Sequence, residues 1–595
     1  MFKFLKLFST KQKENLKEKY SLHSIEEFVD ENINNVVLSS LDEIGKSYSE
    51  IRKLRRRREI FKNQLDLCGL GDIAAKIFIK SWISDLITIK YGVNAENINY
   101  AINFDFPDTY DKFSILLYEY FKDYRYNALK RLISKNRLDK LKDVNGEEMY
   151  AITDDDIDDV FENELIDTRK IKFHEKLDIL VQRIYENTQG LSVIDEIRDM
   201  NCDGISIGVS GIPIDFASKI NDINIKNNEF KVYPMSYDSV WLYLNGREIS
   251  MNFMGFGSQR QLERVCRKIY RFKNSRQFTQ ADGNIINNMA DFSRVSVFRP
   301  PHAESWGAFI RKHDIDGDLD ELIIHENADI VKEFINYLMK AKENIVFSGQ
   351  QGAGKTTLLV AAIKKLYGNS TLRVWEDFFE AFFRIKTPFR NIFTIRKTEE
   401  INGEKGLDNL KKSNGQVTVI SESADDQAKA YVIKGALAAS ECVYSTDHSI
   451  DADKLVDTHR NACLNLGLFR DEIIAEDEVL NVLKWNIPMV NDEENSCRYL
   501  KSITQFIKTD RNEFKYSNDT ESFHENARLY FQMKTNVKRY KTVNIIEFDT
   551  ENRRYVVKNE ISEEKKNEML SKLRDCDKKG FLSLLERMKG ELIKE

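Results

Sequence analysis

The spacing of hydrophobic residues changes along the chain, and these changes predict where helices and strands lie. Residues 1–145 are expected to form a helical N-terminal domain, because apolar side chains recur there every three or four positions. Such stripes are far more often helix faces packed in a core than binding surfaces. The stripes are Ile77, Phe78, Trp82, Ile83, Leu86 and Ile87, followed by Leu116, Leu117, Tyr120 and Phe121.

A polar region follows the helical stripes. Residues 146–167 carry the acidic run Asp154-Asp155-Asp156-Ile157-Asp158-Asp159 and are expected to be a linker. Residues 168–312 mix helical and strand periodicities, and Val240–Leu244 followed by Asn245-Gly246 predicts a β-hairpin. A smaller α+β domain is therefore expected over residues 168–312.

Strands alternate with helices over residues 313–510, which is typical of a doubly wound parallel sheet. The apolar run 344–348 predicts a buried strand, and residues 358–363 predict the helix that follows it. Residues 511–595 are more polar and are expected to form a C-terminal extension, with a strand at 543–548 and a charged helical tail.

Composition narrows the class of protein. With 90 basic and 96 acidic side chains among 595 residues, the net charge of −6 shows no general signature of nucleic-acid binding. The seven cysteines contain no C-x-x-C pair, so neither a zinc knuckle nor a disulfide framework is indicated, and a reducing cytoplasm is expected. No run approaches the roughly 18 apolar residues of a membrane span.

Two segments leave a membrane contact open. At the N-terminus, Lys3 and Lys6 alternate with apolar residues, which suits a helix on its own domain, a frayed end or a membrane surface. Residues 52–58 carry six basic side chains around Leu54, and a solvated helix face is favoured over contact with an anionic membrane or an acidic partner.

Residues 349–357 carry the pattern with the clearest chemistry. The pattern G-x-x-x-x-G-K-[ST] is typical of a loop whose backbone N–H groups surround phosphate oxygens. Its lysine reaches the outer phosphates, its hydroxyl ligates Mg²⁺, and the following helix N-terminus favours anions. A fortuitous glycine-rich turn is the alternative. The predicted nucleotide-binding residues are Gly349, Gln350, Gln351, Gly352, Ala353, Gly354, Lys355, Thr356 and Thr357.

Polar side chains follow the next three predicted strands. Hydrolysis needs a carboxylate that positions water and further acids near hydrated Mg²⁺, and in parallel sheets these lie at the carboxyl ends of strands. For each candidate residue, the alternative interpretation is a surface carboxylate or a helix cap. The candidates are Glu376, Asp377 and Glu380 after strand 372–375, Glu422 after strand 417–420, and His448 after strand 442–445.

This series resembles the secretion traffic ATPases, the motors of type II and type IV secretion and of type IV and tight-adherence pili. Their motif order is phosphate loop, acidic box, Walker B strand with a glutamate, and histidine box. In this chain the corresponding segments are residues 349–357, Glu376-Asp377-x-x-Glu380, residues 417–422 and Thr446-Asp447-His448-Ser449.

The resemblance extends over about residues 170–510. Residues 294–301, Trp306-Gly307 and Ile310-Arg311-Lys312 resemble the family's segment between its two main domains, and residues 498–503 resemble the strand after the histidine box. It implies a RecA-like P-loop NTPase core and a sensor-like α+β domain before it. The helical N-terminal domain is additional, because it has no counterpart in the resemblance.

The resemblance also implies roles for individual residues. Glu422 would polarise the attacking water, and Lys355 would contact the outer phosphates of ATP. Thr356, Glu376 and Asp377 would support Mg²⁺, with Glu380 a weaker candidate. His448 would couple phosphate state to motion, and Arg294 and Arg311 would complete the site between subunits, with surface ion pairs as the alternative. Arg299 is weaker still.

The chain departs from the family at the glutamate strand. The usual Gly-Glu followed by arginine is replaced by Ser421-Glu422-Ser423-Ala424, and Asp447 replaces a residue that is usually apolar. The arginine-x-proline-aspartate before that strand is absent, with residues 413–416 in its place. These changes bear on the hydrolysis rate more than on nucleotide binding. The absence of cysteine pairs favours the tight-adherence and type IV secretion branch.

The resemblance leads us to expect an ATP- and Mg²⁺-dependent motor that is cytoplasmic and peripheral at the inner face of the plasma membrane. It would assemble as a homo-hexamer on an integral membrane platform protein and power pilus assembly or type II/IV protein secretion. A DNA-translocating motor for conjugation or packaging, with a nucleic acid as partner, and a nucleotide-gated scaffold without turnover are the alternatives.

Overall fold

The computed structural model describes residues 14–38, 48–144, 146–227, 233–274, 276–312, 317–397, 403–437, 440–492, 497–509, 519–534 and 539–592. The predicted amphipathic residues 2–8 lie outside these ranges. The chain divides into two compact units, Met1–His313 and Asp314–Glu595. None of the described helices combines the length and the apolar composition that crossing a membrane requires.

The first unit contains a sheet in the order β1-β2-β5-β4-β3-β8-β7-β6, with all neighbours antiparallel except the parallel pair β2 and β5. The strands are β1 Leu141–Val144, β2 Glu147–Ile152, β3 Gly204–Ile207, β4 Val240–Leu244, β5 Arg247–Met251, β6 Asn284–Asn288, β7 Arg294–Phe298 and β8 Gly307–Arg311. The predicted hairpin is confirmed: Asn245 and Gly246, with φ of 52° and 83°, join β4 to β5, as a tight two-residue hairpin turn requires.

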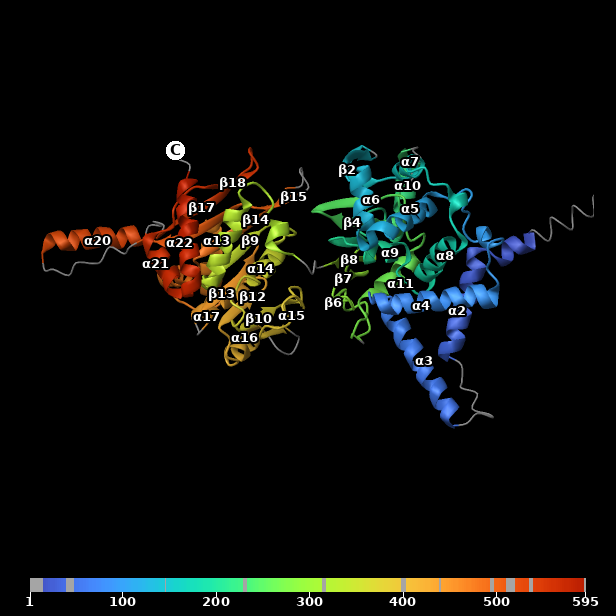
Figure 1. The fold of residues 1–595 in the computed structure, drawn as a ribbon, viewed down its shortest axis with the longest axis horizontal. Helices are drawn as coiled ribbons and strands as arrows, with labels where there is room; N and C mark the ends of the chain where they lie inside the picture. Colours follow the sequence, from blue (N-terminus) through green and yellow to red (C-terminus); the bar gives the residue numbers. More distant parts are fainter. Residues whose placement is uncertain are drawn as a thin grey trace, which may run out of the picture. The chain divides into compact units, whose positions relative to one another are not determined.

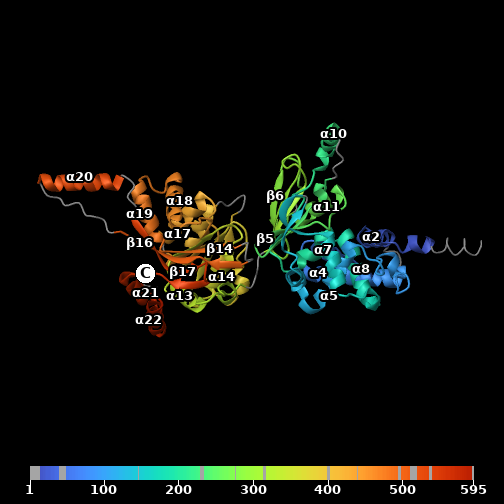
Figure 2. The ribbon, with the colours of Figure 1, turned by 90° about the horizontal axis from the view of Figure 1, so that it is seen from above.

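Helices pack around this sheet (Figure 2). They are α2 Leu22–Leu38, α3 Tyr48–Cys68, α4 Ile73–Asp85, α5 Thr109–Tyr124, α6 Ala128–Asn136, α7 Asp154–Asn163, α8 Phe173–Thr188, α9 Asp195–Asp199, α10 Ala217–Asn227 and α11 Gln259–Ile269. The basic residues 52–58 lie on α3, mostly exposed, as expected for a solvated helix face.

The acidic region 146–167 is not a linker. Its first residues form β2, which pairs with β5, and residues 154–163 form α7. A capping box joins Thr153 to Asp156, and acids in the first turn stabilise a helix through its dipole. Ile157 and Val160 anchor α7 in the core. The predicted helical and α+β domains are therefore parts of one unit, with α5, α6 and the sheet sharing a single hydrophobic cluster.

The second unit has the strand order β11-β10-β12-β13-β9-β14-β16-β17-β18, with β15 paired to β14. The five strands from β11 to β9, together with β14, are parallel. The strands are β9 Ile345–Gly349, β10 Leu372–Glu376, β11 Ile392–Arg396, β12 Val417–Ile420, β13 Cys442–Asp447, β14 Trp485–Asp492, β15 Cys497–Leu500, β16 Ser502–Lys508, β17 Tyr540–Asp549 and β18 Arg554–Val557.

Helices cover both faces of this sheet. Figure 2 shows α17, α18 and α19 on one face and α13, α14, α21 and α22 on the other, and each face has its own hydrophobic cluster. The helices are α12 Leu319–Leu322, α13 Ala328–Lys340, α14 Lys355–Ile363, α15 Phe383–Lys386, α16 Gly403–Lys411, α17 Asp426–Leu437, α18 Ala452–Asn465, α19 Glu472–Val482, α20 Thr520–Lys534, α21 Glu563–Lys572 and α22 Asp575–Gly590.

The strand order confirms the predicted α/β fold class. One parallel strand, β13, lies between β9, which precedes the glycine-rich loop, and β12, which precedes Glu422. Parallel neighbours with helices on both faces are what the predicted doubly wound sheet requires. Continuous burial of β9, β10, β12 and β13 follows from helices on both faces.

The C-terminal region is part of this core rather than an extension. β17 pairs with β16 along its length, and α21 and α22 contribute Met569, Phe581 and Leu584 to the larger hydrophobic cluster. Figure 1 shows α22 beside α13, and a buried carboxylate fastens α21 to the sheet. Glu343, just before β9, accepts from the Trp485 indole N–H at 3.0 Å and from the Lys565 ammonium at 2.9 Å.

Glu343→Ala is predicted to destabilise the second unit. The substitution leaves the buried Lys565 ammonium and the Trp485 N–H without this acceptor, and breaking a buried pair costs about 3 kcal/mol in unfolding free energy. Urea unfolding measures this. As a control, Lys578→Ala removes an exposed pair with Asp575 and is expected to cost less than about 1 kcal/mol. Equal losses in the two variants would contradict the role of Glu343.

Candidate functional site

The glycine-rich loop joins a buried strand to a helix. Gly349 ends β9, and Lys355 begins α14. A Cβ on Gly349, which has φ of 139°, would lie 2.2 Å from the Met489 carbonyl oxygen on β14, so no other residue fits there. Gly352 and Gly354 also have positive φ, 77° and 91°, which glycine adopts without strain. The loop can therefore follow a path that exposes backbone N–H groups.

The other loop residues divide between core and surface. Ala353 is fully buried in the main hydrophobic cluster and anchors the loop, whereas Gln350 and Gln351 are exposed. Thr356 and Thr357, half-buried, lie in the first turn of α14. The first N–H groups of a helix have no partner within the helix and carry a partial positive charge, so they favour anions.

Lys355, His448 and Glu422 form a chain of contacts at the carboxyl ends of three strands. The Lys355 ammonium donates to the carbonyls of Gly349 and Gln350, both at 2.9 Å. It lies 3.2 Å from His448 Nδ1, and His448 Nε2 lies 2.7 Å from Glu422 Oε1. The structure thus joins the predicted lysine, histidine and glutamate directly.

The hydrogen bonds assign the His448 tautomer. An ammonium has only donors, so His448 Nδ1 must accept from Lys355. The imidazole is then neutral with its proton on Nε2, and that N–H donates to the Glu422 carboxylate. The His448 N–H therefore holds the Glu422 carboxylate in place, and the orientation of that N–H depends on the contact between Lys355 and His448 Nδ1.

Strand register explains this convergence. β13 pairs in parallel with β9, Asp447 opposite Ser348, and with β12, Ser445 opposite Ile420. The loop after β9, His448 after β13 and Glu422 after β12 therefore emerge at the same edge of the sheet. Ligands of parallel α/β proteins bind at this edge.

Asp447, which departs from the family pattern, is buried beneath this chain. Its carboxylate accepts from the Ser423 hydroxyl at 2.7 Å and from the Ser449 N–H at 2.7 Å, and the Lys429 ammonium lies 3.9 Å away. Burial alone would raise the pKa of Asp447, but the nearby His459 and these hydrogen bonds hold that pKa below its usual value.

The two departures, Ser423 and Asp447, are thus partners. The Ser423 N–H also donates to the Thr446 carbonyl at 2.8 Å, and that carbonyl lies 2.7 Å from the Ser423 hydroxyl, whose single proton it shares with Asp447. The segment that carries Glu422 is therefore fastened to the segment that carries His448. Sequence spacing could not reveal this, because the pair is 24 residues apart.

Glu376 at the end of β10 is buried and oriented by its own loop. Its Oε1 accepts from the Ala381 N–H at 3.0 Å and from the Glu380 N–H at 3.4 Å. Burial raises the pKa of Glu376 to about 7, against these hydrogen bonds and one to Ser421, which lower it. The carboxyl therefore changes protonation near neutral pH. Asp377 follows it directly, and the assignment of both to Mg²⁺ stays a prediction.

The predicted arginines lie in the first unit. Arg294 and Arg311 are opposite each other on β7 and β8. Arg299 has a local role, because its guanidinium donates to the Phe278 carbonyl at 2.8 Å and lies 4.9 Å from the centre of the Trp306 ring. The proposed role of Arg294 and Arg311 between subunits stays a prediction.

Arg498 is a site residue that the motifs missed. It lies on β15, and its Cδ is 3.6 Å from where a Cβ on Gly354 would be. Its stem therefore covers the loop beside Gly354. It is 144 positions away from that glycine in the sequence, and only the pairing of β15 with β14 brings it there.

These residues fit a nucleoside triphosphate with Mg²⁺. The glycine path, the start of α14 and Lys355 supply donors for phosphate oxygens, and Thr356 supplies a hydroxyl. Within the described ranges, no group of three or more His, Cys, Asp or Glu side chains could hold a metal ion. Mg²⁺ in such sites is bound through one or two protein oxygens, substrate phosphates and water.

Comparisons with known proteins give structural neighbours only. No family model matches the sequence, and no curated protein matches it. The structure is similar to the VirB11 ATPase of the Brucella suis type IV secretion system, with 14% identity, 45% of this chain and 89% of that chain covered, and a TM-score of 0.26.

Two further structures are similar. The Legionella pneumophila ATPase DotB has 14% identity, covers 68% of this chain and 92% of its own, and has a TM-score of 0.35. The pilus retraction motor PilT has 13% identity and a TM-score of 0.34, and the match covers 58% of this chain and 89% of PilT.

Glu376→Gln is predicted to remove a pH-dependent loss of stability. Because the folded pKa is about 7 and the unfolded value is about 4.5, the folded state holds its proton between these pH values, and stability falls as pH rises through that window. Glutamine does not titrate. The variant should therefore gain roughly 2–3 kcal/mol relative to the wild type between pH 5 and pH 8.

Urea unfolding at the two pH values checks this expectation. Glu586→Gln, which changes an exposed carboxylate on α22, is the control and should show no such pH-dependent gain. If the unfolding free energy of Glu376→Gln equals that of the wild type at both pH values, Glu376 is not the buried titrating group.

Asp447→Leu, which restores an apolar residue, is predicted to destabilise the second unit by about 1–3 kcal/mol. The Ser449 N–H loses its acceptor, and the buried Ser423 hydroxyl keeps only the Thr446 carbonyl. Asp447→Asn keeps an acceptor and should cost less. In thermal unfolding, Ser423→Ala should cost less in the Asp447→Leu protein than in the wild type, because the partners are coupled. Additive losses would contradict the coupling.

Proposed function

We propose that this protein is a Mg²⁺-dependent ATPase that works as a homo-hexameric ring at the cytoplasmic face of a membrane. Its motion would power pilus assembly or protein secretion through an integral membrane platform protein. The observation that carries the proposal is the chain from Lys355 through His448 to Glu422 beside a loop suited to phosphate. A fortuitous glycine-rich turn would not be expected to lie next to a glutamate that a histidine orients.

The neighbours support the ATPase class, because VirB11 and DotB are described as ATPases and PilT as a pilus retraction motor. Bound ATP would supply the phosphoanhydride bond, with Mg²⁺ held through Thr356 and the acidic pair Glu376 and Asp377. Lys355 would turn its ammonium toward the phosphate oxygens. Arg294 and Arg311 would complete the site of a neighbouring subunit.

Glu422 is proposed to orient and polarise the attacking water. Its orientation depends on the His448 N–H, and that N–H depends in turn on the Lys355 ammonium at Nδ1. Any movement of Lys355 therefore alters the hydrogen bond that holds Glu422. This gives the chain a way to couple occupancy of the phosphate loop to the position of the glutamate.

The test is phosphate release per subunit with ATP and Mg²⁺, measured as a function of protein concentration. Turnover should rise steeply with concentration, because the site is shared between subunits. Glu422→Gln should lower turnover roughly a hundredfold or more while ATP binding persists, as expected when a positioned carboxylate is lost. Glu441→Gln, an exposed carboxylate paired with Lys342, is the matched control and should keep full turnover.

Two results would contradict the motor. Unchanged turnover in Glu422→Gln would exclude the role given to that glutamate. ATP binding without phosphate release at any protein concentration would favour a nucleotide-gated scaffold. DNA binding that weakens steeply with salt would instead favour a DNA-translocating motor.

A further inference from the structure

A charged cavity lies in the first unit, in a part of the chain to which the proposed function assigns no role. It has a volume of about 370 Å³ and is bounded by α4, α5, α8 and α9. α4 presents Ile73, Lys76, Ile77 and Lys80 to it, a spacing that places all four on one helix face. α8 repeats this spacing from Ile179 to Glu186. Polar side chains thus occupy helix faces that usually carry a packed apolar seam.

Some of these charges hold the walls together. The Lys76 ammonium pairs with Asp195 and, at 2.7 Å, with Asp199. Arg183 on α8 pairs with Asp111 at 2.8 Å and with Glu186 at 3.0 Å. These buried pairs compensate one another, so they explain the shape of the cavity without needing a ligand.

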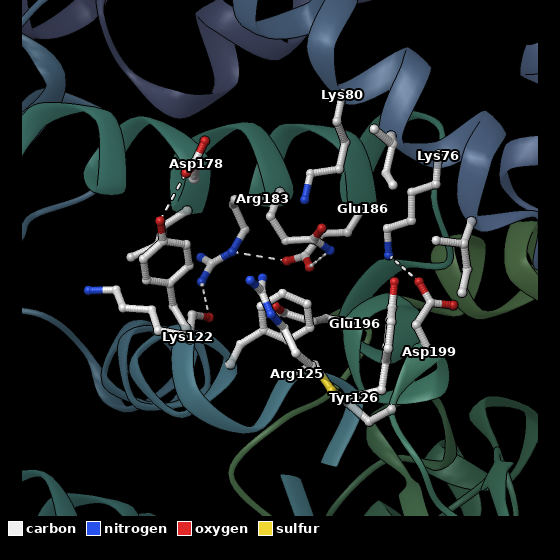
Figure 3. A pocket seen from close by; sticks show the side chains of 18 residues that line it. Lys76, Lys80, Lys122, Arg125, Tyr126, Asp178, Arg183, Glu186, Glu196 and Asp199 are labelled. Carbon is white, nitrogen blue, oxygen red and sulfur yellow. Dashed lines mark hydrogen bonds and ion pairs between the residues drawn. The ribbon is translucent and has the colours of Figure 1, made fainter. Parts of the chain in front are cut away.

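Lys80, Arg125 and Glu196 face the cavity outside these pairs. Within the described residues, their side chains make no hydrogen bond or close ion pair, although Lys80 and Glu196 attract each other and Arg125 lies 5.7 Å from the centre of the Phe121 ring. Figure 3 shows Lys80 and Arg125 pointing into the space from opposite walls. Lys80 lies on α4, whereas Arg125 directly follows α5 and has a positive φ of 50°.

Among the described residues, the charged groups that line the cavity and form no close ion pair are Lys80, Arg125, Glu196 and Asp178, and Asp178 accepts from the Tyr118 hydroxyl at 2.9 Å. Burial raises the pKa of Glu186 to about 8, although the neighbouring Arg183 lowers that pKa. Burial also raises the pKa of Glu196 and, with the neighbouring Lys76, lowers the pKa of Lys80. Lys80 and Arg125 are, in the part of the chain that the structure describes, the two cations of the cavity whose side chains form no close ion pair, and they point into it from opposite walls.

We propose that this cavity binds a small organic anion, a carboxylate or a phosphate ester, between Lys80 and Arg125. Its anionic oxygens accept from the ammonium and the guanidinium, and a hydroxyl or amino group of the same molecule donates to Glu196. The volume is within the usual range for small-molecule sites. Phe121 and Tyr126 line the same space and supply apolar contact for the rest of the ligand.

Pyridoxal 5′-phosphate tests this proposal, because it carries both a phosphate and an aldehyde that condenses with an amine, losing water. Borohydride reduces the resulting imine, and peptide mass spectrometry then reads the labelling of each lysine separately. In the full-length protein, Lys80 should be labelled about tenfold faster than the exposed Lys130 on α6, as expected where charged hydrogen bonds hold the probe. Labelling of Lys355 is read independently, so the proposed ATPase site cannot mimic the result.

Two controls separate anion binding from simple reactivity of Lys80. Pyridoxal without the phosphate should label Lys80 about tenfold more slowly, and inorganic phosphate should protect Lys80 from the phosphorylated probe. Arg125→Gln should remove most of the difference between the two probes while the labelling of Lys130 stays constant. Unchanged Lys130 labelling and an unchanged unfolding temperature would show that the variant is folded.

The proposal is overturned if Lys80 is labelled no faster than Lys130. It is equally overturned if pyridoxal with and without phosphate label Lys80 alike, or if Arg125→Gln leaves the difference intact. These outcomes are read from lysine labelling, so they do not depend on whether the protein turns over ATP.

Discussion

The hydrogen bonds from Lys355 through His448 to Glu422 depend on the order of three parallel strands. β13 lies between β9 and β12, so a histidine at its end can contact the residues that follow both neighbours. If β12 were paired directly with β9, no such intermediate position would exist. The register of the sheet therefore decides which side chains can act together, and the helices on both faces keep that register by burying the strands.

The departures from the family pattern are explained by a second shared constraint. A carboxylate buried at position 447 needs donors, and Ser423, Ser449 and Lys429 supply hydrogen bonds or charge. Two substitutions that look unrelated in sequence thus compensate each other in space. They fasten the glutamate segment to the histidine segment beneath the reacting edge, so the altered strand keeps a defined geometry.

Buried charge also organises regions away from the phosphate loop. Glu343 receives donors from Trp485, Lys565 and Lys572, which makes the C-terminal helices part of the core. In the first unit, Lys76 and Arg183 form ion pairs with carboxylates, whereas the side chains of Lys80 and Arg125 form none within the described residues. The difference separates charges that stabilise the fold from charges that face a cavity.

The sequence by itself determined the glycine-rich loop, the alternation of strands and helices, the β4–β5 hairpin and the polar residues at successive strand ends. These features are local, because glycine positions, hydrophobic period and turn residues act within a few positions of the chain. It did not determine which elements share a sheet or a core. The acidic run at 154–159 suggested a linker, yet a capped helix with two buried apolar residues formed there.

The tertiary structure alone decided the rest, since contacts between distant residues leave no periodic signal. Ile77 and Phe78 match the helical stripe but are 62% and 42% exposed, whereas Ile83, Leu86 and Ile87 of the same stripe are buried. Arg498 reaches Gly354, and Ser423 reaches Asp447, only through strand pairing. The cavity around Lys80 likewise exists because four helices converge, and no single segment carries that information.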